Sequence, residues 1–582
     1  MIGFNKPVVS AIFLVAFLMP FIAGAGDFTF VILGDRTGGA QPGVYESIVN
    51  EVALLDPDMV ITVGDQIEGY TEDEALLNSQ WDEYFGILEA LKMPVYLIPG
   101  NHDILNDVME KVWRKRIGKP PYYSFNFEKV HFVVLDTGRW ESNDELSDKQ
   151  VKWLENDLRK NRNAPLTVVF FHKPLFSKTL VEGKPDRLHD LFKKYGVDAV
   201  FCGHWHKFAT DNFDGIHYTL VGSSGGVIGR VVEEEGSFFH YISAKVKDGK
   251  LSWVVMKKDS VIAPDIISFE DTNFLYQLDT MYVKIKAPEI PSEPGPFALQ
   301  IPLKIENPLD HAITTTVRWE ETPGWKIAPA ERELRIEPGK TLIEEFPALH
   351  DGNLFPVPKY KLDITWKEDR IHKIEKPITL ARLARSARLT KTPVLDGEVT
   401  ASEYPESYAI STWGAYDGGA CVIEPTRFYF GWDDENLYVA THSTQEDTST
   451  ILATAKGKDS AVFADDCVGF FLCPDEEEAI IYQIYFNPLG TSFDAKITFP
   501  TDYSLNQDKE WNGTYDVKTK TGEGYWSLEA RIPLKTLGVT SIQKGDRWRF
   551  NCRRKQQAKR STADFTVPIM AQPEDYGILV FE

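Results

Sequence analysis

The segment Ile98-Pro99-Gly100-Asn101-His102-Asp103 directly follows an apolar run that begins at Val95. An apolar run that stops at Pro-Gly is typical of a buried strand that ends in a tight loop. Polar residues in such a loop project from the end of a sheet, where open α/β folds bind their ligands. The segment therefore indicates a ligand site, although Asn, His and Asp are also ordinary turn residues.

The same pattern recurs through residues 27–257, where strand-like runs alternate with helix-like stretches, which indicates an α/β domain. Five of the runs end in a Gly or a polar residue followed by a metal-ligand residue type: Asp35, Asp65, Asn101, His172, and His204 with His206. Each of these residues could be an ordinary turn residue, but turn residues alone are not expected to place metal-ligand types at five strand ends. Carboxylate, amide and imidazole groups together suit manganese, iron or zinc. Two such ions about 3.5–4 Å apart can clamp a phosphate and activate a water.

In order and spacing, these residues resemble the calcineurin-like metallophosphoesterase superfamily. The motifs that carry the resemblance are Gly34-Asp35, Gly64-Asp65-Gln66-Ile67-Glu68, Gly100-Asn101-His102-Asp103, His172 and Gly203-His204-Trp205-His206. The resemblance implies a double β-sheet sandwich flanked by helices. It also implies hydrolysis of phosphate esters at two divalent metal ions.

The resemblance further implies a role for each residue. Asp65 would bridge the two ions. The other ligands would divide into a first-ion set and a second-ion set: Asp35 and His206, and Asn101, His172 and His204. His102 would not be a ligand; it would act as a general acid toward the leaving oxygen, or it would stabilise charge on the phosphate. Glu68 stands where the superfamily often has an Asp that orients this histidine, so it is expected to do the same.

One position departs from the superfamily pattern. Many members have a His two residues after the first Asp, where this chain has Thr37. A hydroxyl is a much poorer ligand than an imidazole, so the strength of the first ion site is in doubt. Arg36 and Thr37 are candidates for substrate contact, Arg36 because a guanidinium pairs well with phosphate oxygens. A surface role is the alternative for Arg36.

Two all-β domains are expected after the first domain, which we place at residues 26–265. Short alternating strands with Pro-rich breaks predict an immunoglobulin-like β-sandwich spacer at residues 266–380, with no convincing helix from Phe274 onward. Residues 381–582 predict a second β-sandwich. It resembles the family-nine-type carbohydrate-binding modules and their DOMON-like relatives through residues 395–397, 432–439, 525–533 and 545–551.

The tryptophans of this last domain divide into two groups. Sugar sites use exposed aromatic faces, so Trp413 and Trp511, which lie in polar segments, are candidates for glycan contact. Three others lie in strand patterns and are expected in the core: Trp432, Trp526 and Trp548.

The net charge and the N-terminal segment limit which partners and which cellular location we expect. The net charge of −23 argues against nucleic acid or an anionic membrane surface as partner, because both need basic patches. Lys6, an apolar stretch at residues 8–22 and Ala23-Gly24-Ala25 are typical of a signal peptide cut after Ala25, at residues 1–25. A membrane anchor is the alternative, disfavoured because the stretch is short. No span is expected in the mature chain, which would be secreted or periplasmic.

Together these features predict an exported, metal-dependent phosphoesterase that acts on a small phosphorylated substrate, either a monoester or a diester. The C-terminal domain would target a glycan. The alternative is a carbohydrate- or surface-binding protein whose first domain is degenerate and inactive, which the weak first ion site motivates.

Overall fold

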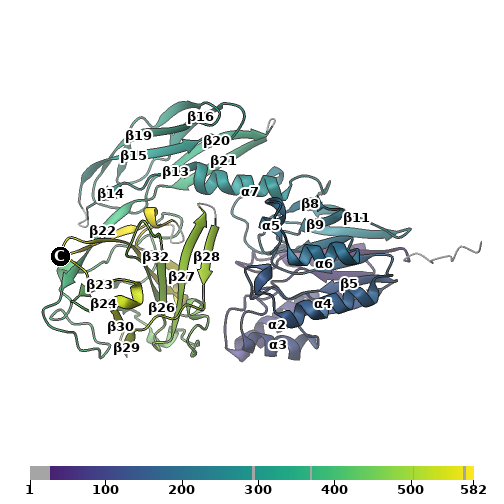
Figure 1. Cartoon of the computed structure of the whole chain (residues 1–582), viewed down its shortest axis with the longest axis horizontal. Coiled ribbons are helices and arrows are strands. Elements are labelled where there is room, and N and C mark those ends of the chain that lie inside the picture. Colours follow the sequence, from purple (N-terminus) through teal and green to yellow (C-terminus); the bar gives the residue numbers. More distant parts are fainter. Residues whose placement is uncertain (1–25, 292–294, 368–369, 502–503, 568–571) are drawn as a thin grey trace, which may run out of the picture.

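The computed structural model describes residues 26–291, 295–367, 370–501, 504–567 and 572–582. The expected signal peptide at residues 1–25 lies outside the described residues. Figure 1 shows an α/β domain followed by two all-β parts, with a helix running between the first part and the second. A bilayer-crossing helix, which needs both length and an apolar surface, is not found among the described residues.

The first domain contains two six-stranded sheets. The first sheet has the order β12-β11-β10-β1-β2-β3, with β1 (Phe28–Leu33), β2 (Met59–Thr62), β3 (Val95–Tyr96), β10 (Tyr241–Lys247), β11 (Lys250–Lys257) and β12 (Ser260–Ile262). The second has the order β4-β5-β6-β7-β9-β8, with β4 (Tyr123–Phe127), β5 (Val130–Val134), β6 (Thr167–Phe170), β7 (Ala199–Cys202), β8 (Ala209–Phe213) and β9 (Ile216–Leu220). Neighbours β1, β2 and β3 are parallel, and so are β5, β6, β7 and β9.

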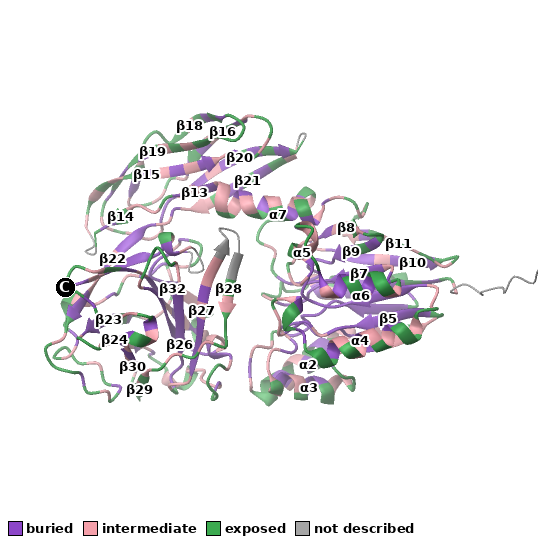
Figure 2. Ribbon diagram, viewed as in Figure 1, coloured by how far each residue is buried: buried purple, intermediate pink, exposed green. Residues whose placement is uncertain are grey.

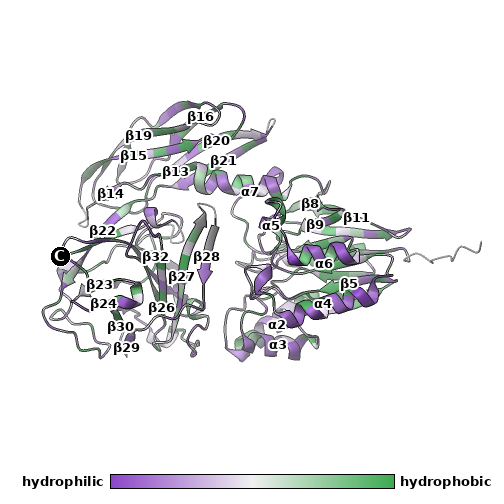
Figure 3. Ribbon diagram, in the orientation of Figure 1, coloured by the Kyte–Doolittle hydropathy of each residue, from purple (hydrophilic) through white to green (hydrophobic). Residues whose placement is uncertain are grey.

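Helices cover the outer faces of both sheets. They are α1 (Val44–Leu55), α2 (Glu74–Leu88), α3 (Asp107–Ile117), α4 (Asp148–Asn161), α5 (Ser177–Val181) and α6 (Arg187–Tyr195). Within β1, Phe30 and Ile32 join the core between the sheets, whereas Val31 and Leu33 pack with α1 and α2. Because side chains alternate across a strand and both faces are covered, the central strands β1, β2, β6 and β7 are mostly apolar. Figure 2 shows the central strands buried, and Figure 3 shows polar residues on the outer helices. The predicted double-sheet fold is confirmed.

The predicted β-sandwich spacer is present as two four-stranded sheets, β13-β15-β19-β17 and β18-β16-β20-β21. Their strands are β13 (Val283–Ile285), β15 (Phe297–Glu306), β16 (Ile313–Trp319), β17 (Trp325–Ile327), β18 (Glu331–Ile336), β19 (Thr341–His350), β20 (Lys359–Lys367) and β21 (Arg370–Pro377). The expectation of no helix from Phe274 onward is wrong, because α7 (Phe269–Gln277) continues as a π-helical turn to Tyr282. A nine-residue helix is too short for its periodicity to stand out, and the side chain of Ser268 caps it.

The C-terminal part is a thirteen-stranded β-structure. Its strands are β22 (Ala381–Arg388), β23 (Thr426–Trp432), β24 (Asn436–Thr444), β25 (Cys467–Cys473), β26 (Ile481–Phe486), β27 (Ser492–Thr501), β28 (Ser504–Asp508), β29 (Asp516–Gly522), β30 (Tyr525–Pro533), β31 (Arg547–Gln556), β32 (Ser561–Asp564), β33 (Gly577–Phe581) and, from the spacer, β14 (Glu289–Ile290). The sheet therefore recruits β14 across the predicted boundary at residue 380. The boundaries themselves stay predictions.

The tryptophans of this part lie only partly as expected. The three predicted core tryptophans, Trp432, Trp526 and Trp548, are buried. Trp413 is buried as well, and its indole N–H donates to the carbonyl oxygen of Thr426 at 2.9 Å. The ring face that we proposed for sugar binding is therefore covered by protein. The prediction failed because a polar flanking sequence does not show that distant strands pack over the residue. Trp511 is half-buried and packs against Tyr482 with ring centroids 5.2 Å apart.

Candidate metal centre

The polar strand-end residues converge at one edge of the first domain. Asp35, Asp65 and Asn101 follow β1, β2 and β3, whereas His172 and the pair His204 and His206 follow β6 and β7. Because the carboxyl ends of parallel strands open at the same edge of a sheet, the loops of the two facing sheets meet there. The structure therefore brings together the six residues that the sequence singled out.

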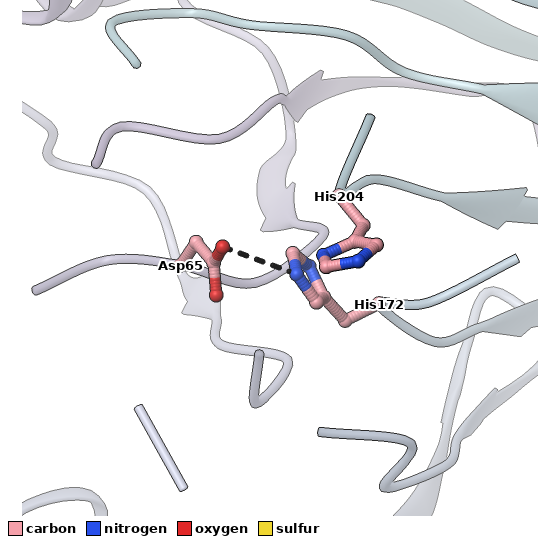
Figure 4. A group of neighbouring side chains, drawn as sticks. All are labelled: Asp65, His172 and His204. Atoms are coloured by element: carbon pink, nitrogen blue, oxygen red, sulfur yellow. Dashed lines mark ion pairs between the residues drawn. The ribbon is translucent and has the colours of Figure 1, made fainter. Parts of the chain in front are cut away.

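Two groups of possible metal ligands share Asp65. Asp65, His172 and His204 form one group, shown in Figure 4, and Asp35, Asp65 and His206 form the other. Within each group the ligand atoms lie within 4.8 Å of one another. Oδ2 of Asp65 lies 3.1 Å from Nε2 of His172. A carboxylate common to both groups has the position that a bridge between two ions requires.

Asn101 belongs to the second-ion set by position. Its Oδ1 lies 2.9 Å from Nε2 of His172, so the amide oxygen faces the same point as Oδ2 of Asp65. Its Nδ2 donates to the hydroxyl of Tyr70 at 2.6 Å. Sequence reasoning missed Tyr70, because no motif sets it apart from other tyrosines. The tyrosine orients the amide, so it is a positioning residue.

Backbone carbonyls orient two of the histidines. Nδ1 of His172 lies 2.8 Å from the carbonyl oxygen of Val63, and Nδ1 of His206 lies 2.7 Å from that of Val227. A carbonyl oxygen only accepts, so both Nδ1 atoms carry hydrogen and donate. The Nε2 atoms then face carboxylate oxygens, with Nε2 of His206 3.3 Å from Oδ2 of Asp35. Metal-binding histidines are held in this way.

In the loop after β1, Oδ1 of Asp35 and Oγ1 of Thr37 are buried and have no hydrogen-bond partner among the described residues. A buried acceptor left unpaired costs roughly 1–3 kcal/mol, and more when it is charged. A cation beside these oxygens would remove that cost. The donor set is carboxylate, amide, imidazole and hydroxyl, without thiolate, and it fits a divalent ion of intermediate hardness.

The pKa shifts have clear causes. Burial raises the pKa of Asp65, but the charge and hydrogen bond of His172 outweigh it and hold that pKa below its usual value. Burial lowers the pKa of His172, but the charges of Asp65 and Asp35 outweigh it and raise that pKa to about 9. Burial, helped by the charges of His172 and Lys173, lowers the pKa of His204 to about 2. His204 is therefore a neutral imidazole, the form that binds a metal.

The glycines directly before Asp65 and Asn101 are needed because other groups approach them closely. A Cβ on Gly64 would lie 2.4 Å from Nδ1 of His172, and one on Gly100 would lie 2.2 Å from Oδ1 of Asp65. Asp65 itself has a φ of 56°, in the left-handed region that non-glycine residues rarely occupy. Strained backbone of this kind persists only where surrounding contacts hold it, and it is common at functional sites.

Asp103 makes many of the contacts that hold the backbone at Asp65 in this conformation. Its carboxylate is buried and accepts hydrogen bonds from the backbone N–H groups of Asp65, Gln66, Ile67 and Gly100 at 2.8–3.3 Å. It thus ties the loop after β2 to the loop after β3. These contacts give Asp103 a structural role.

His102 lies beside the shared carboxylate. Its Nε2 is 4.0 Å from Oδ2 of Asp65, and its backbone N–H donates to Oδ1 of Asp65 at 3.0 Å. The structure differs from the expectation at Glu68. Nδ1 of His102 lies 2.7 Å from the backbone carbonyl oxygen of Glu68, whereas the Glu68 carboxylate is exposed and accepts from the N–H of Ala40. The ring is therefore oriented by main chain, which the sequence could not show.

The two candidate substrate contacts lie differently. The Arg36 guanidinium is buried, donates to the carbonyl oxygen of Gln66 at 3.0 Å and pairs with Glu83. These contacts hold it within the domain, and substrate contact by Arg36 stays a prediction. Thr37 is fully buried two residues after Asp35, and its hydroxyl is unpaired among the described residues.

Comparisons with known proteins bear on the class of the first domain. The family model of the calcineurin-like phosphoesterases matches residues 28–208, and the first domain is a calcineurin-like metallophosphoesterase domain. The chain is 28% identical over 180 residues to acid phosphatase type 7 of Mus musculus, a match that covers 26% of this chain and 40% of that protein. It is 26% identical over 252 residues to tartrate-resistant acid phosphatase type 5 of Homo sapiens, covering 36% of this chain and 77% of that protein.

The match to the first of these relatives spans less than half of that relative's length. Among solved structures, a family 9 carbohydrate-binding module from Caldicellulosiruptor kristjanssonii in complex with cellotriose aligns with 34% of this chain and 93% of its own. The identity is 17% and the TM-score is 0.24, so this likeness establishes no ligand.

Proposed function

We propose that this protein is an exported, metal-dependent phosphoesterase that hydrolyses phosphate monoesters or diesters at a dinuclear site in its first domain. The observation that carries the proposal is the carboxylate of Asp65, shared between two groups of ligand atoms. The phosphatase relatives and the family match support it. Asp35, Asp65 and His206 would hold the first ion; Asp65, Asn101, His172 and His204 would hold the second.

When bound, two divalent ions would balance the charge of the phosphate and lower the pKa of water. The residues of the chain would position the metal ligands and protonate the leaving alcohol. Tyr70 and the carbonyl of Val63 hold Asn101 and His172 in place. His102 donates Nδ1–H to the carbonyl of Glu68, so its Nε2 is the atom that would deliver a proton to the leaving alcohol.

The rival function is a glycan- or surface-binding protein with an inactive first domain. Thr37 motivates it, because imidazole is the stronger ligand at that position. The unpaired oxygens of Asp35 and Thr37 favour the enzyme, since both would be satisfied by an ion. Secretion rests on the signal-peptide pattern before residue 26, and glycan targeting rests on the sequence resemblance of residues 381–582.

Turnover of nitrophenyl phosphate by the metal-loaded protein tests the proposal, together with metal analysis. The expected result is hydrolysis with two ions bound per chain, abolished by a chelator and restored by manganese. Absence of hydrolysis with any of manganese, iron or zinc, combined with binding of a glycan, would establish the rival function.

A further inference from the structure

A cavity of about 480 Å³ lies between the first domain and the C-terminal domain. The first domain contributes Leu105, Asn106 and Arg139, and the C-terminal domain contributes the rest of the wall, from β25, β26, β27, β31 and neighbouring loops. Figure 1 shows β26, β27 and β28 on the side of the C-terminal part that faces the first domain. The volume is within the range of small-molecule sites.

Cations dominate the charged groups of this wall. Four of the lining residues are basic, Arg139, Lys509, Arg553 and Lys555, and one is acidic, Asp459. This excess occurs in a chain whose net charge is −23. A cavity lined by one sign of charge concentrates ligands of the opposite sign.

The cations are not equally neutralised. Arg553 donates to both carboxylate oxygens of Asp564, at 2.7 and 3.0 Å. Lys509 is less tightly paired, with Nζ 3.7 Å from a carboxylate oxygen of Glu141. Nζ of Lys555 donates to the carbonyl oxygen of Phe463 at 2.9 Å, and no carboxylate of the described residues lies within ion-pair distance of it. Lys555 is half-buried, and a half-buried cation without a counter-ion favours an anionic ligand.

Two chains of contacts connect the cavity to the metal centre. Phe463, in the cavity wall, packs edge-on against Tyr70 with the ring centroids 6.1 Å apart. Tyr70 in turn packs edge-on against His102 with the centroids 4.4 Å apart. On the other side, Glu141 lies near Lys509 and accepts from Nζ of Lys173, the residue after His172. One residue, Tyr70, therefore separates the cavity wall from His102, and Glu141 with Lys173 separates Lys509 from His172.

We propose that this cavity binds the remainder of the substrate, meaning the part attached to the phosphate that is hydrolysed, and that this part carries an anionic group of its own. The inference rests on the proposed function and narrows it to phosphate esters of acidic alcohols, about hexose-sized. Lys555 and Lys509 contact the anionic group, and the amides of Asn106, Gln483 and Gln507 offer hydrogen bonds to hydroxyl groups around it. The C-terminal domain thus completes the substrate site.

Size-matched esters test this specificity. Glucose 6-phosphate has a neutral remainder, 6-phosphogluconate has a carboxylate, and a hexose 1,6-bisphosphate has a second phosphate. We expect kcat/KM to be about tenfold higher for the charged esters, the effect of one charge-assisted hydrogen bond. The two charged esters distinguish a carboxylate from a phosphate as the preferred group.

Lys555→Gln removes the charge and keeps a polar, flexible side chain, one atom shorter than that of lysine. The ratio of kcat/KM between charged and neutral esters should fall about tenfold. Lys559→Gln is the matched control, because Lys559 is four residues away, pairs with Glu424 and is not part of the wall. If Lys555→Gln does not fold, Lys509→Gln on a different segment provides the same comparison.

Equal kcat/KM for charged and neutral esters in the wild type, or equal ratios in Lys555→Gln and Lys559→Gln, would overturn the inference. If no ester is hydrolysed at all, the proposed function fails instead. Calorimetry of the metal-loaded full chain with the hexose 1,6-bisphosphate then decides about the cavity. A Kd raised about tenfold by Lys555→Gln supports the anion site, and an unchanged Kd refutes it.

Discussion

The hydroxyl of Tyr70 lies 2.6 Å from Nδ2 of Asn101 and turns the amide oxygen toward Nε2 of His172. Tyr70→Phe removes this acceptor and lets the amide rotate, so we expect affinity for the second ion to fall at least about tenfold. Titration of the metal-free protein with manganese measures the change. Tyr122→Phe is the control, because Tyr122 packs on Trp153, and equal affinities in the two variants would contradict the positioning role.

Asp65→Asn should remove both ions together. Asp65 is the one carboxylate shared by the two ligand groups, and an amide oxygen without charge cannot balance two cations. We expect metal content near zero and no measurable hydrolysis. Metal analysis of Asp65→Asn beside the surface variant Asp248→Asn is the measurement; normal turnover by Asp65→Asn would refute the dinuclear mechanism.

His102→Ala should separate catalysis from metal binding. His102 is held by the carbonyl of Glu68 and lies near Asp65 without belonging to either ligand group. Loss of a general acid lowers turnover by about 10²–10⁴-fold. Metal content should stay at the wild-type value, and loss of an ion would show that His102 is a ligand. An aryl phosphate with a good leaving group should be affected less than an alkyl phosphate, because it needs less protonation.

Thr37→Val tests the unpaired hydroxyl at the first site. Valine keeps the shape of the side chain and removes Oγ1, which has no partner among the described residues. If this oxygen binds the first ion, that ion should be held about tenfold more weakly, the loss expected for one neutral contact to a cation. Metal content at limiting manganese should then approach one ion per chain. Unchanged content would leave Asp35, Asp65 and His206 as the complete first set.

His372 makes the contact between the first domain and the spacer depend on pH. Its Nδ1 lies 2.8 Å from Glu235 and its Nε2 lies 3.2 Å from Asp279. Burial lowers the pKa of His372, but hydrogen bonds to Asp279 and Glu235 outweigh it and raise the pKa to about 9. An unfolded histidine titrates near 6.5, so the stabilisation is complete below about pH 6.5 and is lost as pH rises through about 9.

The size of this contribution is on the order of 3 kcal/mol. The Tm difference between wild type and His372→Gln, measured from pH 6 to pH 10, should therefore shrink toward zero at the alkaline end. His311→Gln is the control on the same sandwich, because His311 is exposed. A Tm difference that stays constant across this range would show that His372 is not charged in the folded protein.

Much of the metal centre could be predicted from local sequence. Asp35, Asp65, Asn101, His172, His204 and His206 each follow an apolar run, and a buried strand delivers the next polar residue to the sheet edge. The glycines at positions 64 and 100 can also be recognised in the sequence, because only glycine lets the side chains of His172 and Asp65 come so close to the backbone. These properties depend on a few consecutive residues, so they can be read along the chain.

Other features depend on partners far away in the chain. Trp413 is covered by strands that follow it in the sequence, and the helix α7 is recognisable only once its buried face has a neighbour. His102 is held by the main chain of Glu68 and not by its carboxylate. Main-chain contacts of this kind leave no trace in residue type.

By itself, then, the sequence determined where the strands of the first domain lie along the chain and which types of ligand follow them, because strand burial and tight turns are local. Only the tertiary structure decided how those ligands divide around Asp65 and that Tyr70 orients Asn101. It alone also placed Lys555 in the wall of a cavity between two domains, although the last ligand of the metal centre, His206, lies 349 positions earlier in the chain. Such contacts depend on packing between separate sheets, which no stretch of neighbouring residues encodes.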